Sequence, residues 1–211
     1  RGVPALSGRS LMSIKDLSKQ ELLDVLACSI ALKTAFKGGA SGIERELPLL
    51  GKSVAMIFQK RSTRTRVSTE TGMGMLGGQA LFLGPSDIQL GVNESLKDTA
   101  RVLGRFNSIV LARVFAHRDV VTLQASAGVP VINALSNLHH PLQTLADIMT
   151  LQEQFGAELA GRTVAWVGDG NNVLHDLLLG AAKLGVNVRI ACPPDYLPDA
   201  GIMQTASDLG K

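Results

Sequence analysis

The chain has 211 residues, of which 45% are hydrophobic and 18% are charged. This composition supports a sizeable core and excludes a disordered chain. No apolar run reaches the roughly 18–20 residues that a membrane-spanning helix needs, so we expect no membrane partner. The net charge of +3 suits an anionic small molecule, and aromatic residues make up only 4%. Few side chains are therefore available to stack on bases, and we expect no nucleic-acid partner.

The chain begins at Arg1, and its first ten residues, RGVPALSGRS, are basic and contain no acidic residue. This composition fits the end of an organelle transit segment, and it fits a shortened chain equally well. Cys28 and Cys192 lack metal-ligand spacing and are too few to cross-link a chain of this size. We expect both to be reduced thiols in an intracellular protein.

Helical and strand patterns alternate along the first 150 residues. Residues 18–37 have helical periodicity, and Ser18 with Glu21 forms a capping-box pattern at its start. Near-continuous apolar strands separated by helices are typical of a parallel sheet covered by helices on both faces. The expected strands are 52–58, 79–84, 108–114 and 129–134, and the expected helices are 62–76, 95–106, 117–127 and 141–155.

A second alternation follows residue 150. Strand patterns at 163–168 and 186–192 flank a helical pattern at 172–184. One βαβ unit cannot bury both faces of its own sheet, so this unit is expected to be incomplete. We predict an α/β chain with one domain over residues 1–150. A connecting helix and the start of a second, doubly wound α/β domain are expected over 151–211.

The stretch FQKRSTRTRVSTETG, residues 58–72, follows an apolar strand and concentrates cations and hydroxyls. Ser62 or Thr63 is expected to begin a helix, whose first N–H groups and positive dipole end attract a phosphate. Arg61 and Arg64 are three residues apart, so we expect them to share a helix face. A Walker A sequence is absent, which favours a phosphate that is not a nucleotide. The alternative is a solvated basic helix start.

Two further strand ends carry polar side chains. Arg113 ends the 108–114 strand, and ligands of open α/β sheets bind outside the carboxyl ends of strands. His140 precedes Pro141, which suits the first position of a helix, and Gln143 lies three residues beyond His140. We interpret these side chains as ligand contacts. The alternatives are an ordinary strand-end arginine and a structural histidine.

Two other segments have weaker signals. WVGDGNNVLHDLL, residues 166–178, lacks the G-x-G-x-x-G dinucleotide pattern. Asn171 and Asn172 at a helix start instead suit the carboxylate of an amino acid, because each amide donates hydrogen bonds. PSDIQLGVNES, residues 85–95, reads as a connecting loop in which Ser95 caps the next helix.

STRTR after an apolar strand resembles the carbamoyl-phosphate motif of the aspartate and ornithine transcarbamylases. FQKRSTRTRVSTETG, DIQLGVNES, LARV, HHPLQTLAD and GDGNN occur in the order and approximate spacing of the ornithine transcarbamylase branch. The resemblance extends from LMSIKDLS to the end of the chain. It implies transfer of the carbamoyl group from carbamoyl phosphate to the δ-amine of L-ornithine, giving L-citrulline and phosphate in arginine biosynthesis and the urea cycle. It also implies a homotrimer without cofactor or metal, in the mitochondrial matrix or alternatively the cytoplasm.

The resemblance assigns roles residue by residue. Arg64, Arg113 and His140 are the candidate catalytic residues, and Asn172 is expected to bind the α-carboxylate of ornithine. Gln89 is expected to reach a neighbouring subunit's site. The residues expected to bind carbamoyl phosphate are Ser62, Thr63, Arg64, Thr65, Gln89, Arg113, His140 and Gln143.

The sequence also departs from the family pattern. His139 has no counterpart and is expected at the surface, and Gln59 stands where many relatives have another polar or acidic residue. The Asp and Ser-Met-Gly loop and the His-Cys-Leu-Pro loop of the family have no match, and neither Cys28 nor Cys192 replaces the reactive cysteine. This piece alone is therefore expected to be inactive. The alternatives are a transcarbamylase for aspartate, putrescine or an acylated ornithine, and a non-catalytic module that binds carbamoyl phosphate or a partner subunit.

Overall fold

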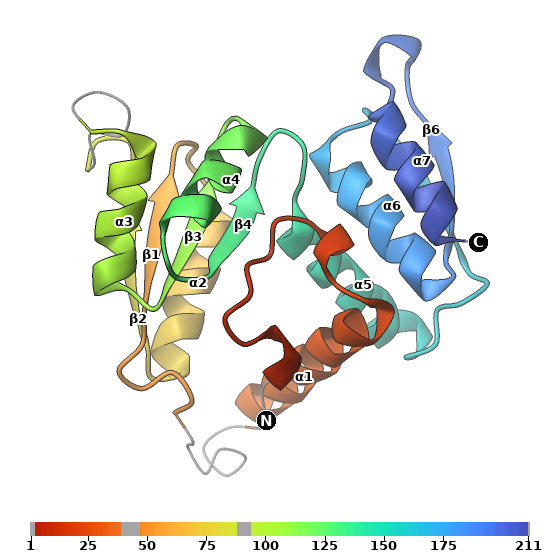
Figure 1. The fold of residues 1–211 in the computed structure, drawn as a ribbon. Coiled ribbons are helices and arrows are strands. Elements are labelled where there is room, and N and C mark those ends of the chain that lie inside the picture. Colours follow the sequence, from red (N-terminus) through yellow and green to blue (C-terminus); the bar gives the residue numbers. More distant parts are fainter. Residues whose placement is uncertain (1–2, 39–46, 88–93, 211) are drawn as a thin grey trace.

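The computed structural model describes residues 3–38, 47–87 and 94–210 of the chain. Its larger sheet has four parallel strands in the order β2-β1-β3-β4 (Figure 1). The strands are β1 (Ser53–Phe58), β2 (Gln79–Leu83), β3 (Ile109–Arg113) and β4 (Val131–Leu135). The predicted parallel sheet is therefore confirmed. The last strand begins at Val131 rather than at 129, and Pro130, which lacks an N–H donor, precedes it.

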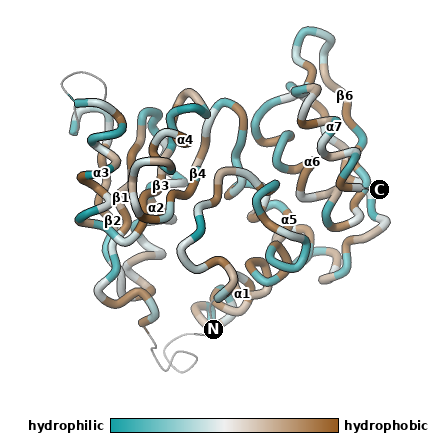
Figure 2. The backbone as a smooth tube through the Cα atoms, viewed as in Figure 1, coloured by the Kyte–Doolittle hydropathy of each residue, from teal (hydrophilic) through white to brown (hydrophobic). Residues whose placement is uncertain are grey.

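Helices cover both faces of this sheet. On one face, α3 (Leu96–Phe106) and α4 (His117–Ser126) pack on the side chains of alternate strand residues, including Ala55 and Ile57. On the other face, Met73 of α2 (Thr63–Met75) and Leu142 of α5 (Pro141–Phe155) pack on Met56 and its neighbours. Figure 2 shows hydrophobic stretches along the sheet strands, between these helical layers. The near-continuous apolar strands of the sequence are explained by this double burial.

A second apolar cluster joins the start of the chain to its last third. α1 (Lys19–Lys37) and the short 3₁₀ helices η1 (Pro4–Leu6) and η2 (Ile14–Asp16) precede the sheet. The side chains of Ile14, Leu22 and Leu26 are buried with Ile148 of α5 and with α6 (Asn172–Leu184). Leu11 also pairs with the edge of β4. The N-terminal segment therefore contacts both the first sheet and α6.

The remaining elements form the predicted βαβ unit. β5 (Thr163–Val167) and β6 (Asn187–Ala191) are parallel and flank α6. The 3₁₀ helix η4 (Pro194–Tyr196) and α7 (Ala200–Leu209) follow. The division into domains at residue 150 remains a prediction. No helix in the described part of the chain is long and apolar enough to cross a membrane.

Candidate active site

The N-terminus of α2 has open backbone donors. Ser62 is its N-cap: the hydroxyl accepts a hydrogen bond from the Thr65 N–H at 3.3 Å and donates to Thr65 Oγ1 at 3.0 Å. This cap starts the helix at Thr63. The N–H groups of Thr63 and Arg64 belong to the first turn and have no intrahelical partner. Together with the positive end of the helix dipole, they provide a local environment for an anion.

The structure brings most of the predicted binding residues together around one cavity of about 810 Å³. They come from the first turn of α2, from the end of β3 and from the first turn of α5. The cavity therefore lies outside the carboxyl ends of the parallel strands, as expected for this type of sheet. The predicted residues that line it are Ser62, Thr63, Arg64, Thr65, Arg113, His140 and Gln143.

Arg113 lines this cavity and has one donor without a partner. Its Nε is buried and makes no hydrogen bond within the described structure. Burial, and then the guanidinium of Arg64, lower the pKa of Arg113 from its ordinary value. A guanidinium remains protonated in proteins, so the two arginines place two positive charges on one cavity. An anionic ligand would relieve this repulsion.

His140 is positioned as a neutral imidazole. Burial, and then the charge of Arg113, lower the pKa of His140 to about 4. Its Nδ1 is buried without a hydrogen-bond partner in the described structure. The backbone N–H of His140 donates to Asp176 Oδ2 at 2.7 Å. At neutral pH, His140 can therefore donate one hydrogen bond and accept another.

Gln59 links two strand ends beside the site. Its Oε1 accepts a hydrogen bond from the Phe115 N–H at 2.7 Å, and its Nε2 donates to Asp119 Oδ2 at 3.2 Å. Its backbone N–H donates to the carbonyl oxygen of Arg113 at 2.8 Å. Gln59 thus connects β1 to the end of β3 and to the start of α4, an effect that the sequence did not predict.

Gln143 and Gln89 differ from the other predicted binding residues. Gln143 lines the cavity, but its Nε2 donates to Asp147 at 2.8 Å. Gln89 lies outside the described residues, so its predicted contact with a neighbouring subunit stays a prediction.

The two asparagines at the start of α6 make different hydrogen bonds. Asn171 is the N-cap, and its Oδ1 accepts from the N–H groups of Val173 and Leu174. Asn172 Nδ2 donates to the carbonyl oxygen of Ser136 at 2.6 Å. Asn171 is used as the helix cap, so only Asn172 is left of the two amides expected to bind a carboxylate. Asn172 does not line the 810 Å³ cavity.

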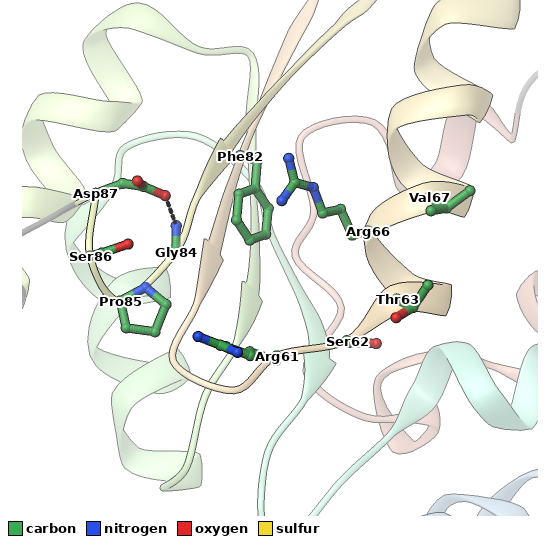
Figure 3. A pocket seen from close by; sticks show the side chains of 10 residues that line it. All are labelled: Arg61, Ser62, Thr63, Arg66, Val67, Phe82, Gly84, Pro85, Ser86 and Asp87. Atoms are coloured by element: carbon green, nitrogen blue, oxygen red, sulfur yellow. Dashed lines mark hydrogen bonds between the residues drawn. The ribbon is translucent and has the colours of Figure 1, made fainter.

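The prediction that Arg61 and Arg64 share a helix face is wrong. α2 begins at Thr63, so Arg61 precedes the helix. Arg61 instead lines a second cavity of about 750 Å³, together with Arg66 and Phe82 (Figure 3). The guanidinium of Arg66 lies 3.7 Å from the centre of the Phe82 ring, and its Nε contacts Glu70 at 3.1 Å. The three arginines of this stretch are thus divided between two cavities.

The prediction that His139 lies at the surface is also wrong. His139 is 8% exposed. Its N–H donates to Ser136 Oγ at 3.1 Å, and its ring packs edge-on against the ring of His117 with centroids 5.0 Å apart. His139 Nδ1 lies 3.3 Å from Asp176 Oδ1, outside hydrogen-bond geometry. The turn after β4 folds inward and buries this side chain.

Asp176 is the functional candidate that the sequence interpretation missed. It lies on α6, is 0% exposed and accepts the backbone N–H of His140. The available signal was a carboxylate within the apolar run HDLLLGAAKL, because buried charges require partners. Within residues 3–38, 47–87 and 94–210, no group of three or more His, Cys, Asp or Glu side chains could hold a metal ion.

The fold and the cavity define an open α/β protein with a cavity lined by arginines at a helix start. The family model for the carbamoyl-phosphate binding domain of aspartate/ornithine carbamoyltransferases matches residues 9–153. The model for the aspartate/ornithine binding domain matches residues 160–211. The chain belongs to the aspartate/ornithine carbamoyltransferase family.

Individual relatives agree with this assignment. The mitochondrial ornithine carbamoyltransferase of Aquarana catesbeiana is 48% identical over 207 residues, which cover 98% of this chain and 58% of the relative. The ornithine carbamoyltransferase of Methanobrevibacter smithii is 48% identical over 202 residues, covering 96% of this chain and 64% of the relative. The solved structure of the Pyrococcus furiosus ornithine carbamoyltransferase superposes with a TM-score of 0.92 at 44% identity, covering 97% of this chain and 64% of that one. The chain thus spans about three fifths of the length of these relatives.

Proposed function

We propose that the protein transfers the carbamoyl group of carbamoyl phosphate to the δ-amine of L-ornithine, forming L-citrulline and phosphate. The observation that carries this proposal is the shared cavity of the α2 N-terminus, Arg113, His140 and Gln143. Its open amides and guanidinium groups suit a phosphate, and its neutral imidazole and carboxamide suit a carbamoyl group. The names of the relatives support ornithine as the acceptor.

In the proposed ground state, the phosphate lies against the first turn of α2. The N–H groups of Thr63 and Arg64 and the hydroxyls of this turn bind its oxygens, and the guanidinium groups of Arg64 and Arg113 balance its charge. The carbamoyl group then points toward His140 and Gln143. Because the pKa of His140 is lowered to about 4, its ring remains neutral at pH 7 and adds no third positive charge.

The proposed reaction forms one bond and breaks one bond at the carbamoyl carbon. The deprotonated δ-amine attacks this carbon, and negative charge develops on the carbamoyl oxygen. Arg64, Arg113 and His140 are the candidates to stabilise that charge by donated hydrogen bonds. The C–O bond to phosphate then breaks, and the amine proton leaves to the phosphate or to solvent. Loss of one such donor typically lowers a rate by about 10²–10³-fold.

Asn172 is the proposed contact for the α-carboxylate of ornithine. It occupies the first position of α6, where the helix dipole favours an anion. One hydrogen of its amide is used by the Ser136 carbonyl at 2.6 Å, and an amide NH₂ has a second hydrogen to donate.

A homotrimer in the mitochondrial matrix is the proposed state of the protein, with the cytoplasm as the alternative compartment. In this trimer, Gln89 would contact a neighbour's phosphate site, in a head-to-tail arrangement that closes as a ring. The mitochondrial ornithine carbamoyltransferase of Aquarana catesbeiana, a relative of this chain, supports the compartment. Sedimentation equilibrium of the 22.3 kDa chain tests the trimer.

Calorimetric titration with fresh carbamoyl phosphate tests the binding step on this chain. Citrulline formation by the whole protein that contains it tests the transfer. We expect saturable binding and a product from ornithine, with no product from aspartate, putrescine or an acylated ornithine. Turnover of one of those amines instead would reassign the acceptor. Binding without turnover of any of them by the whole protein would indicate a non-catalytic binding module.

A further inference from the structure

The turn between β4 and α5, residues 136–140, is held by one face of α6 (Figure 1). Three α6 side chains at positions i, i+3 and i+4 contact alternate backbone groups of this turn. Positions with this spacing lie on the same face of a helix. The contacts are Asn172 Nδ2 to Ser136 O at 2.6 Å, His175 Nδ1 to Leu138 O at 2.9 Å, and His140 N to Asp176 Oδ2 at 2.7 Å.

The hydrogen-bond network defines the tautomer of the middle contact. His175 Nδ1 faces a carbonyl oxygen, so it carries the hydrogen. Its Nε2 then accepts a hydrogen bond from the Asp199 N–H at 3.0 Å. His175 is 5% exposed, and both of its ring nitrogens are occupied. This histidine therefore stabilises the turn and has no donor left for a ligand.

Asp176 differs from Asn172 and His175 because its contact is with His140, which lines the cavity. The carboxylate is fully buried. Its Oδ1 accepts hydrogen bonds from Ser13 Oγ at 2.7 Å and from the Ile14 N–H at 2.9 Å, while Oδ2 accepts the His140 N–H. The remaining bond directions of the His140 backbone are restricted by Pro141, which follows it. The carboxylate and the proline together constrain the backbone from which the His140 ring projects.

We propose that Asp176 is a positioning residue for the carbamoyl end of the cavity. It orients His140 through the backbone and makes this part of the cavity depend on α6, the helix that carries Asn172. The phosphate end is built from α2 and Arg113 and has no contact of this kind with α6 in the described structure. Loss of Asp176 should therefore weaken recognition of the carbamoyl group and leave recognition of phosphate intact.

The substitution Asp176→Asn is expected to disrupt the His140 contact selectively. An asparagine has one acceptor oxygen and one donor NH₂. The oxygen is favoured on the side with two donors, Ser13 and Ile14. The NH₂ then faces the His140 N–H, where two donors oppose each other. This change keeps the side-chain volume, removes the negative charge, and opposes the His140 N–H with a donor while the contacts to Ser13 and Ile14 keep an acceptor.

The inference rests on the proposed function, and the test separates the two. The dissociation constants of carbamoyl phosphate and inorganic phosphate are measured for the 211-residue chain and its variants. We expect Asp176→Asn to lower the preference for carbamoyl phosphate by about tenfold or more, the range for a hydrogen bond to a charged group. Ser13→Ala, which removes a contact to Oδ1 and keeps the His140 contact, should preserve the preference.

Three outcomes would overturn the claims. An unchanged preference in Asp176→Asn, or an equal loss of both affinities, rejects Asp176 as a positioning residue. An unmodified chain that binds phosphate without preferring carbamoyl phosphate rejects the proposed function instead. If Asp176→Asn does not fold by circular dichroism, the same ratio is measured on Asp176→Ser. Faster hydrogen exchange of the His140 amide in either folded variant, relative to Ser13→Ala, is the independent sign of a released backbone contact.

Discussion

The carboxamide of Gln59 donates to the carboxylate of Asp119 at 3.2 Å, across the gap between the end of β1 and α4. The same carboxamide accepts the Phe115 N–H at 2.7 Å. An acidic residue at position 59 could accept from Phe115 but could not donate to Asp119. The amide at position 59 therefore determines whether the end of β1 attracts or repels Asp119 at the start of α4.

We predict that Gln59→Glu destabilises the chain by about 1–3 kcal/mol, because it replaces a hydrogen bond by two facing carboxylates. Urea unfolding at pH 7 measures the loss, which should shrink at lower pH as a carboxylate is protonated. The double variant Gln59→Glu/Asp119→Asn restores one donor and one acceptor and should recover most of the stability. Equal losses in the single and double variants would contradict the assigned contact.

Alanine substitutions at two glycines are expected to change the stability of the fold in opposite directions. A Cβ on Gly104 in α3 would lie 1.8 Å from the carbonyl oxygen of Ala127, next to α4. A Cβ on Gly74 in α2 would meet nothing within 4 Å. We expect Gly104→Ala to lower the free energy of unfolding by about 1–3 kcal/mol or more. Gly74→Ala should raise it by up to about 1 kcal/mol. Thermal unfolding of both variants measures the difference, and a neutral Gly104→Ala would mean that α3 and α4 are not in close contact there.

The sequence predicted much of the fold because its signals were local. Apolar runs of strand length, the Ser18 and Glu21 capping box and Pro141 at a first helical position all act within a few residues, and each appears in the structure. The prediction that Arg61 and Arg64 share a helix face was wrong, and the reason is also local. Arg61 precedes both candidate caps, Ser62 and Thr63, so it lies outside the helix and the three-residue spacing to Arg64 does not give a shared face.

Other features depended on contacts between distant residues, which no local pattern contains. His139 is buried by the ring of His117, and Asp176 lies against Ser13, which is 163 positions away in the chain. Periodicity describes which face of a helix is apolar, but it does not identify the partner of a buried carboxylate. The strand-end positions of Arg113 and His140 were predictable because parallel strands align their carboxyl ends.

The two arginines Arg64 and Arg66 should differ sharply in ligand binding. Arg64 lines the 810 Å³ cavity, whereas Arg66 is paired with Glu70 and stacked on Phe82 in the second cavity. We expect Arg64→Ala to weaken carbamoyl phosphate binding on the order of a hundredfold or more. Arg66→Ala should cost less than about fivefold, the scale of an exposed ion pair. Calorimetric titration of both variants with carbamoyl phosphate measures the two losses in affinity. Similar losses would indicate a diffuse basic surface.

The last prediction concerns the protonation of His140. Because the pKa of His140 in the folded chain is lowered to about 4, the folded state holds a neutral ring where the unfolded state, with its ordinary value near 6.5, is protonated. Below pH 6.5 the unfolded state therefore binds more protons, and stability should fall as the pH is lowered from 6.5 to about 4. His117, whose pKa burial also lowers, contributes with the same sign.

Proton-detected NMR of the histidine rings separates these contributions. The His140 ring should titrate near pH 4 in the free chain, and its signals should not change between pH 6 and 8. The fall in stability between pH 6.5 and 4 should be smaller in His140→Gln, which cannot take up the proton, than in the unmodified chain. A His140 midpoint above 7 would make an imidazolium beside Arg113 the main form at neutral pH. That result would contradict the neutral ring that the proposed ground state assigns to His140.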